Sequence, residues 1–294
     1  MYFRIKIKDN MNEFKPENIL KENVDLATME SLPIPYIEDK VVLGLDIYRY
    51  SQYPSIQQIY IPVIFERLYY MTMTDIKKNE PYLFSEYGNN LADYKKKFIS
   101  TGDGGFQIFD NVLQAVVFAL YFQVFLKRFC TGGSLNEIDK NLFKLVDTID
   151  LRFAISRDKI YSYKSNYFGP AIINNARILS KDSLNRLLID SNSIKWLSRT
   201  INAPENLIDI NKKSLSKTMY FKDYDKSQKS FLFDESDQIV SVDIQKVGAL
   251  KAKETKLDIY NMHVQARINV KVEHQDYSIY MVSLGNLNTT GITE

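Results

Sequence analysis

The stretch KKKFISTGDGGFQIFD, Lys95 to Asp110, decides how the middle of this chain folds. Two apolar runs of strand type, Phe98–Ile99 and Phe106–Phe109, stand on either side of Gly102-Asp103-Gly104-Gly105. An Asp-Gly pair between two such runs is a strong signal for a β-hairpin. The sequence therefore predicts a hairpin with Asp103 at its tip, and the question is whether Asp103 does more than make the turn.

The segments around this hairpin predict alternating strands and helices. Lys40–Tyr48 is typical of a strand buried on both faces, and residues 54–71 and 111–128 predict helices, the first kinked or restarted at Pro62. The rest of the chain predicts two strands joined by an Arg-Asp-Lys turn within Thr148–Tyr163, a helix over Gly169–Lys181, a strand and helix over Asn185–Arg199, and a hairpin over Ser241–Met262.

This order predicts an α+β fold of ferredoxin-like βαββαβ type. Because hairpins are present, the sheet is expected to be mixed, with the helices on one face. We expect residues 1–37 to be a leader packed on the domain, residues 38–262 to form the domain, and residues 263–294 to add a C-terminal strand or tail.

Composition narrows the possible functions of the chain. Its 294 residues carry 38 basic and 36 acidic side chains, so no overall positive field attracts nucleic acid. One cysteine, Cys130, and two histidines exclude an internal disulfide and make a zinc site or a Ser-His-Asp triad improbable. A metal site would have to be built from carboxylates, which suit magnesium or manganese.

Nothing at the start of the sequence predicts export or a membrane span. The first ten residues, MYFRIKIKDN, lack the apolar core of a signal peptide. The apolar run Val112–Leu126 is shorter than the roughly 18 residues that a span needs, so we expect a buried helix rather than a membrane-associated one. A cytoplasmic protein is the resulting expectation.

Two acids, Asp46 and Asp103, are expected to converge at one edge of the sheet. In a βαββ arrangement the first strand lies beside the hairpin, so the end of one and the turn of the other meet. Two carboxylates there repel each other unless a cation lies between them, and magnesium meets that need. The alternative is that Asp103 is only a turn residue and Asp46 only a helix cap.

These residues resemble the class III nucleotidyl cyclases. LGLDIYRYS (Leu43–Ser51) is similar to their first metal-binding strand, and STGDGGFQIF (Ser100–Phe109) to their hairpin with the second metal acid. LRFAISRDKIYSY, YFGPAIINNARILSKDSLNRLLIDSNSI and VGALKAKETKLDIYNM resemble the later segments of the same domain, in the same order. Gly169-Pro170-Ala171 most resembles the bacterial anti-phage pyrimidine (uridylate or cytidylate) cyclases of the Pycsar type.

The resemblance implies a function and a set of site residues. A nucleoside triphosphate, with UTP or CTP favoured, would be converted to a 3′,5′-cyclic monophosphate and pyrophosphate at the interface of a homodimer, for a separate effector that responds to the cyclic nucleotide. Two Mg²⁺ or Mn²⁺ ions per site would be held by Asp46, the Ile47 carbonyl and Asp103. The implied catalytic residues are Arg177 and Asn174, and the implied substrate-binding residues are Tyr48, Tyr50, Ser51, Ile99, Asn166, Lys251 and Lys253.

The sequence departs from the family pattern at three positions. The ribose-orienting Asn usually stands four residues before the catalytic Arg, where this chain has Ile173, with Asn174 one place later. The adenine-reading positions hold Ile99 and Asn166, and an aliphatic side chain cannot hydrogen-bond adenine, which favours a pyrimidine. An adenylate or guanylate cyclase, a non-catalytic nucleotide sensor, a diguanylate-cyclase-like enzyme and a purely structural protein remain alternatives.

Overall fold

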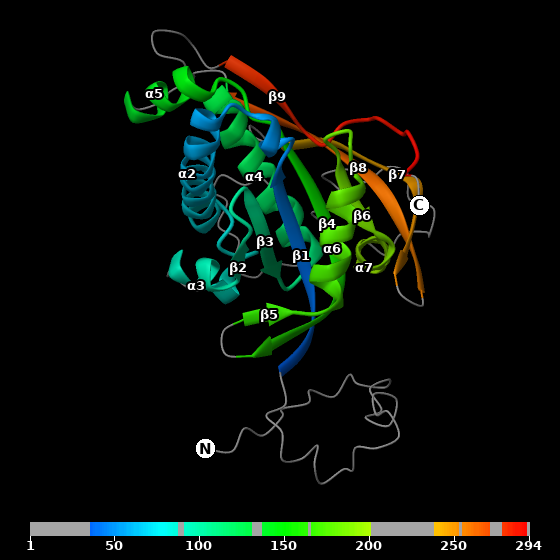
Figure 1. Ribbon diagram of the computed structural model, residues 1–294. Coiled ribbons are helices and arrows are strands. Elements are labelled where there is room, and N and C mark those ends of the chain that lie inside the picture. Colours follow the sequence, from blue (N-terminus) through cyan, green and yellow to red (C-terminus); the bar gives the residue numbers. More distant parts are fainter. Residues whose placement is uncertain are drawn as a thin grey trace.

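The computed structural model describes residues 36–87, 91–130, 137–163, 166–200, 238–252, 255–270 and 278–292. Its centre is one mixed sheet whose strands are ordered β2-β3-β1-β4-β6-β8-β7, with β5 paired to β4 and β9 to β8 (Figure 1). Only β4 and β6 pair in parallel among the described strands. The strands are β1 Tyr36–Ile47, β2 Phe98–Ser100, β3 Gly104–Phe109, β4 Leu151–Tyr163, β5 Asn166–Phe168, β6 Leu187–Asp190, β7 Gln238–Ala252, β8 Thr255–Val270 and β9 Ser278–Leu284.

The helices connect these strands and confirm the predicted α+β class. They are α2 Ser55–Asn79, α3 Leu91–Lys96, α4 Val112–Cys130, α5 Glu137–Val146, α6 Pro170–Lys181 and α7 Ser191–Thr200, with 3₁₀ turns η2 Tyr50–Gln52 and η3 Ser85–Tyr87. Of the helices in the described ranges, α4 alone has the length and apolar composition of a membrane span, and most of it is buried inside the fold. It is the core helix that its sequence predicts.

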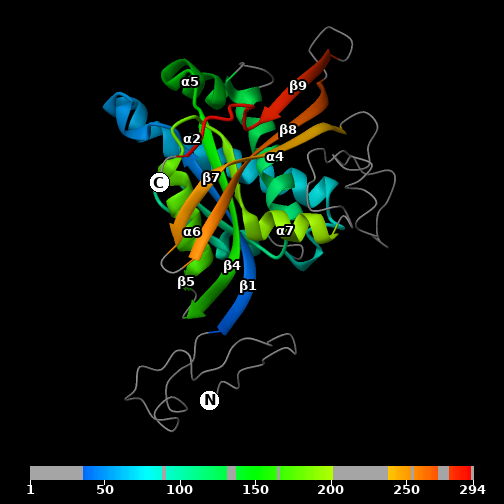
Figure 2. The ribbon, with the colours of Figure 1, turned by 90° about the vertical axis from the view of Figure 1, so that its right-hand side faces the viewer.

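The expectation that all helices lie on one face of the sheet is wrong. Val41 and Leu43 of β1 point into the core shared with α2 and α4, whereas Val42 packs with Ala171 of α6. Helix α6 therefore covers the opposite face, and Figures 1 and 2 show it apart from α2 and α4. A central strand with apolar side chains on both faces must be packed against other elements on both faces. The sequence of β1 is apolar on both faces.

The predicted turn inside Thr148–Tyr163 is also wrong, because β4 runs unbroken from Leu151 to Tyr163. It pairs with β1 along the whole of that strand, from Tyr36 opposite Ser162 to Ile47 opposite Leu151. The charged residues that suggest a turn are paired across the strands: Arg157 Nη2 donates to Asp39 Oδ2 at 2.6 Å. Cross-strand charge pairs of this kind let a strand continue beyond the apolar core.

Helix α2 continues through Pro62 and does not restart there. A proline inside a helix leaves the carbonyl four residues earlier without its N–H partner. Here that carbonyl belongs to Gln58, and the Tyr50 hydroxyl donates to it at 2.7 Å. Tyr50 therefore supplies the donor that Pro62 lacks.

The expected boundaries at positions 37 and 262 both fall inside strands. Strand β1 begins at Tyr36, and residues 1–35 of the expected leader lie outside the described residues. Strand β8 passes through Met262 and continues to Val270, where it pairs with β9. The C-terminal residues thus extend the same sheet.

Candidate functional site

Antiparallel pairing of β1 with β3 brings Asp46 and Asp103 together at one end of the sheet. Asp46 lies opposite Gly104 in the register, and the Ile47 N–H donates to the Asp103 carbonyl at 3.1 Å. Burial raises the pKa of Asp46 above its ordinary value, the Arg152 guanidinium opposes that rise, and the negative charge of Asp103 adds to it. The two carboxylates are therefore close enough to interact electrostatically.

The glycines of the hairpin make this approach possible. A Cβ on Gly104 would lie 2.1 Å from the Leu45 carbonyl oxygen and 3.0 Å from the Asp46 Cα, so only glycine fits against β1 here. Gly102 has φ +99°, a conformation that favours glycine. The Gly-Asp-Gly pattern thus both forms the turn and sets Asp103 next to Asp46.

A third charged residue, Arg152 of β4, completes the cluster. Its Nε donates to Asp46 Oδ2 at 2.5 Å, and its Nη1 donates to the Asp182 carbonyl at 2.7 Å. Sequence reasoning missed this residue. The available signal was a single charge inside the apolar run Leu151–Ile155 of a central strand, where a charge needs a partner.

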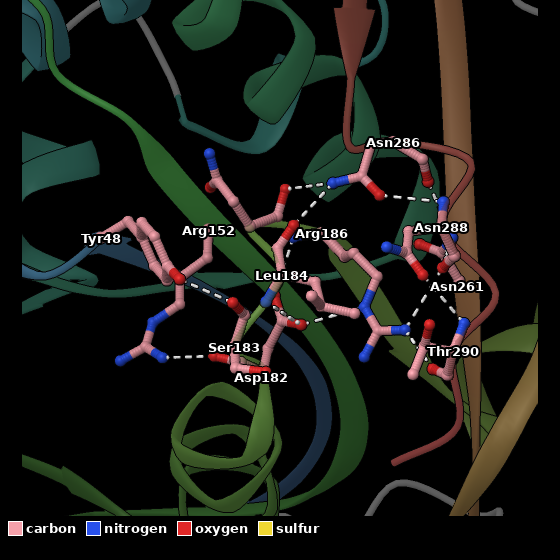
Figure 3. Close-up of polar contacts among 11 residues, drawn as sticks. Tyr48, Arg152, Asp182, Ser183, Leu184, Arg186, Asn261, Asn286, Asn288 and Thr290 are labelled. Carbon is pink, nitrogen blue, oxygen red and sulfur yellow. Dashed lines mark hydrogen bonds and ion pairs between the residues drawn. The ribbon is translucent and has the colours of Figure 1, made fainter.

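The loop that receives Arg152, between α6 and β6, is held by the C-terminal segment (Figure 3). Asp182 Oδ1 accepts from Arg186 Nε at 2.9 Å, and Arg186 Nη1 donates to the Thr290 carbonyl at 2.7 Å. Asn286 Nδ2 donates to the Leu184 carbonyl at 2.7 Å. Arg186 is 1% exposed and Asp182 is 2% exposed, so the ion pair at the centre of this clamp lies in the protein interior.

The loop after Asp46 is fixed to the same place. The Tyr48 hydroxyl donates to the Ser183 carbonyl at 2.6 Å, as Figure 3 shows, and Arg49 stacks its guanidinium over the Tyr48 ring. Ser51 is exposed in η2, and its carbonyl accepts from Gln58 Nε2 at 3.4 Å. Tyr48 and Tyr50 therefore both have structural hydrogen bonds, while Ser51 presents its side chain to solvent.

The predicted residues on α6 divide between the two sides of that helix. Asn174 is 7% exposed, and its amide donates to Asp158 Oδ2 at 3.4 Å, toward the sheet. Asn175 is fully buried and donates to the Val42 carbonyl at 2.8 Å, which anchors α6 on β1. Ile173 is 46% exposed, and positions four apart share a helix face, so Arg177 lies on the same outward side.

Within the described part of the chain, the Arg177 guanidinium has no hydrogen bond or ion pair. The single chain thus leaves the half-buried Arg177 on the outward side of α6 and does not join it to the carboxylates.

Of the remaining predicted residues, Ile99 is on the same hairpin as Asp103, and Lys251 is on a distant strand. Ile99 is half-buried in β2 opposite Phe106, and Asn166 is exposed in β5. Lys251 is exposed near the tip of the β7–β8 hairpin, and β4, β6 and β8 separate its strand from β1. Lys253 lies outside the described residues. A single chain therefore does not bring the predicted triphosphate lysine to the carboxylates.

The donor atoms at the carboxylate pair suit a hard divalent cation. No group of three or more His, Cys, Asp or Glu side chains arranged to hold a metal occurs in the described ranges. Two carboxylates, together with the Ile47 carbonyl that the sequence predicts as a ligand, would form an all-oxygen set of the kind magnesium uses when water and phosphate oxygens complete its octahedron. The like charges of Asp46 and Asp103 would be neutralised by such an ion.

No family model and no curated protein matches the chain. Among solved structures, it is similar to an adenylate/guanylate cyclase/hydrolase from Silicibacter pomeroyi, at 13% identity and a TM-score of 0.42, over 76% of this chain and 96% of that one. It is also similar to the adenylyl cyclase CyaB from P. aeruginosa, at 10% identity and a TM-score of 0.43, over 77% and 95% of the two chains. The guanylyl cyclase Cya2 matches at 11% identity and a TM-score of 0.43, over 78% and 94%.

Proposed function

We propose that this protein is a metal-dependent nucleotidyl cyclase that converts a nucleoside triphosphate to a 3′,5′-cyclic monophosphate and pyrophosphate. The observation that carries the proposal is the pairing of β1 with β3, which sets Asp46 beside Asp103 at a glycine-built close approach. A strand-end acid and a hairpin acid that meet in this way form a binding site for the divalent ions of phosphoryl transfer. The motifs of the sequence supply the reaction class.

Each residue has a defined task in this reaction. Asp46, the Ile47 carbonyl and Asp103 would hold Mg²⁺ or Mn²⁺, and the bound ions would acidify the 3′-hydroxyl and neutralise phosphate charge. Arg177 stabilises the charge that grows on the α-phosphate as the 3′-oxygen attacks and pyrophosphate leaves. Most of the catalytic effect comes from positioning and charge stabilisation.

A homodimer with sites at its interface completes the proposal. Arg177 stands unpaired among the described residues on the outward side of α6, and three strands lie between β1 and the strand of Lys251. We therefore propose that each is presented to a second protomer rather than to Asp46 of its own chain. In the dimer, the arginine and lysine of one protomer meet the carboxylates of the other. Lys253 is proposed to act beside Lys251.

We further propose a pyrimidine substrate and a cytoplasmic signalling role against phage. Ile99, in place of the family's adenine-reading lysine, offers no hydrogen-bonding group to adenine, and Asn166 stands in place of the acid of the same pair. Ser51, exposed at the turn before α2, is the available hydroxyl on the loop that follows Asp46. The cyclic product would be read by a separate effector.

The test is incubation of the purified protein with Mn²⁺ and each of ATP, GTP, CTP and UTP, with products identified by mass. A cyclic pyrimidine monophosphate that disappears in Asp103→Asn supports the reaction, the base preference and the role of Asp103. A cyclic purine keeps the reaction and refutes the base preference. The absence of any cyclic product from folded, dimeric protein refutes the cyclase.

A non-catalytic nucleotide sensor is the second candidate, and Asn174 favours it. The amide of Asn174 is turned toward Asp158, and Ile173 occupies the outward position four residues before Arg177. A sensor would bind Mn²⁺-nucleotide through Asp46 and Asp103 without releasing pyrophosphate. Equilibrium binding and pyrophosphate release, measured on the same sample, distinguish the two.

A further inference from the structure

We propose that Arg152 is a positioning residue that acts as a resident cation at Asp46 and lowers the affinity of the carboxylate pair for divalent metal in the nucleotide-free protein. The inference rests on the proposed metal-dependent function of the same site. It starts from the contact of Arg152 Nε with Asp46 Oδ2, at 2.5 Å, between side chains that are 22% and 20% exposed. A guanidinium stays charged at every physiological pH, so this cation is permanent.

Arg152 is held in place from behind. Its Nη1 donates to the Asp182 carbonyl at 2.7 Å, so the guanidinium bridges the metal acid and the α6–β6 loop. Asp182 is itself fixed in position, because its carboxylate accepts hydrogen bonds from the Arg186 side chain at 2.9 Å and from the Arg186 backbone N–H at 2.7 Å. Arg186 is in turn bonded to the carbonyls of Asn288 and Thr290 (Figure 3). The clamp keeps Arg152 directed at Asp46.

This geometry fixes the charge balance of the site. Asp46 and Asp103 together carry two negative charges, and Arg152 removes one of them. An ion that approaches Asp46 finds Oδ2 already bonded, which leaves the other carboxylate oxygen, and it is repelled by the guanidinium. The triphosphate of a substrate adds negative charge, so metal and nucleotide favour each other's binding. Arg152 therefore also orients the carboxylate before the ion arrives.

The test measures Mn²⁺ binding to the full-length, nucleotide-free protein. Binding is monitored through the electron paramagnetic resonance signal of the Mn²⁺ that stays free in solution. Removing the positive charge in Arg152→Gln is expected to tighten Mn²⁺ binding by about tenfold. Arg152→Lys keeps the charge and is expected to bind Mn²⁺ as the wild type does. The matched control is Arg157→Gln, which removes another β4 arginine paired with a β1 aspartate, Asp39, and should leave Mn²⁺ affinity unchanged.

Circular dichroism and the thermal midpoint of each variant establish that it is folded before binding is measured. Equal or weaker Mn²⁺ binding by folded Arg152→Gln would overturn the inference. So would a tenfold gain in Arg152→Lys, which would show that loss of the bridge, and not of the charge, frees the site. The lysine variant keeps the inference testable even where the glutamine variant fails to fold.

The assay separates this inference from the proposed function because it needs no turnover. Adding Asp46→Asn to Arg152→Gln should abolish the gain in Mn²⁺ affinity. If Arg152→Gln gains Mn²⁺ affinity but the wild type forms no cyclic product from any nucleotide, the proposed cyclase activity is refuted and the role of Arg152 is kept. Cyclic product from the wild type, with unchanged Mn²⁺ affinity in Arg152→Gln, refutes the role of Arg152 alone.

Discussion

Replacing Gly104 by alanine should separate the two carboxylates without changing either of them. The new Cβ would lie 2.1 Å from the Leu45 carbonyl oxygen, and real Cβ contacts are essentially never shorter than 3.0 Å, so β3 must move from β1 by at least about 0.9 Å. The obstacle is backbone and cannot rotate aside. Asp103, the preceding residue, moves with the hairpin and away from Asp46.

We expect Gly104→Ala to lower kcat by about 100-fold, since a shift of about 1 Å in catalytic groups has an effect of that size. Unfolding free energy should fall by about 1–3 kcal/mol through overpacking. The matched control is Gly105→Ala, whose Cβ would lie 2.4 Å from the Ile99 carbonyl and so strains β3 against β2, not against β1. Cyclic-product formation with Mn²⁺ and urea unfolding measure the two effects. Equal losses of activity in both variants would refute the reasoning.

Three further predictions concern charge. Asp103→Asn should reduce cyclic-product formation by about 10³-fold with no loss of unfolding free energy, because it relieves repulsion with Asp46. Asp93→Asn, at a partly exposed acid on α3, serves as control, and retained activity in Asp103→Asn would contradict the prediction. Burial raises the pKa of Asp190 from 3.8 to about 6, so the folded state binds this proton more tightly than the unfolded chain does. Its contribution to unfolding free energy should therefore fall by about 2 kcal/mol between pH 4 and pH 7. The difference between wild type and Asp190→Asn in denaturant titrations should show this fall, and a rise with pH would contradict the prediction. Arg186→Ala should lower unfolding free energy by about 3–5 kcal/mol, because it leaves Asp182 charged and buried without its partner; a urea midpoint within error of the wild type would contradict this.

Local patterns in the sequence were sufficient to predict most elements near the site. The Asp-Gly pair between apolar runs predicted the hairpin that places Asp103, and the apolar run before Asp46 predicted a central strand. Both depend on neighbours within a few residues, where turn propensity and side-chain alternation act directly. The same kind of local signal gave a wrong prediction at Arg157-Asp158-Lys159. A charged triplet predicts a turn, whereas in the structure these residues continue β4 and pair with β1.

Contacts between distant segments could not be predicted from these patterns. Pro62 predicts a break in the helix. The helix nevertheless continues, because the Tyr50 hydroxyl on a preceding turn donates to the Gln58 carbonyl that Pro62 leaves without an N–H donor. The contact of Asn174 with Asp158 of β4 was not predicted either, since it depends on how α6 lies on the sheet. The link from Arg152 through Asp182 and Arg186 to Thr290 joins three distant segments, which are β4, the α6–β6 loop and the C-terminal segment.

The sequence by itself determined the class of fold, the Gly-Asp-Gly turn, and the positions of Asp46 near a strand end and Asp103 in a hairpin turn, because each follows from short-range propensity and alternation. Only the tertiary structure decided that α6 covers the second face of the sheet, that Arg152 bonds Asp46, and that the C-terminal segment clamps the loop behind it. These features depend on strand register and on which faces pack together. Register is set by the sum of many long-range contacts, and no single stretch of sequence contains that sum.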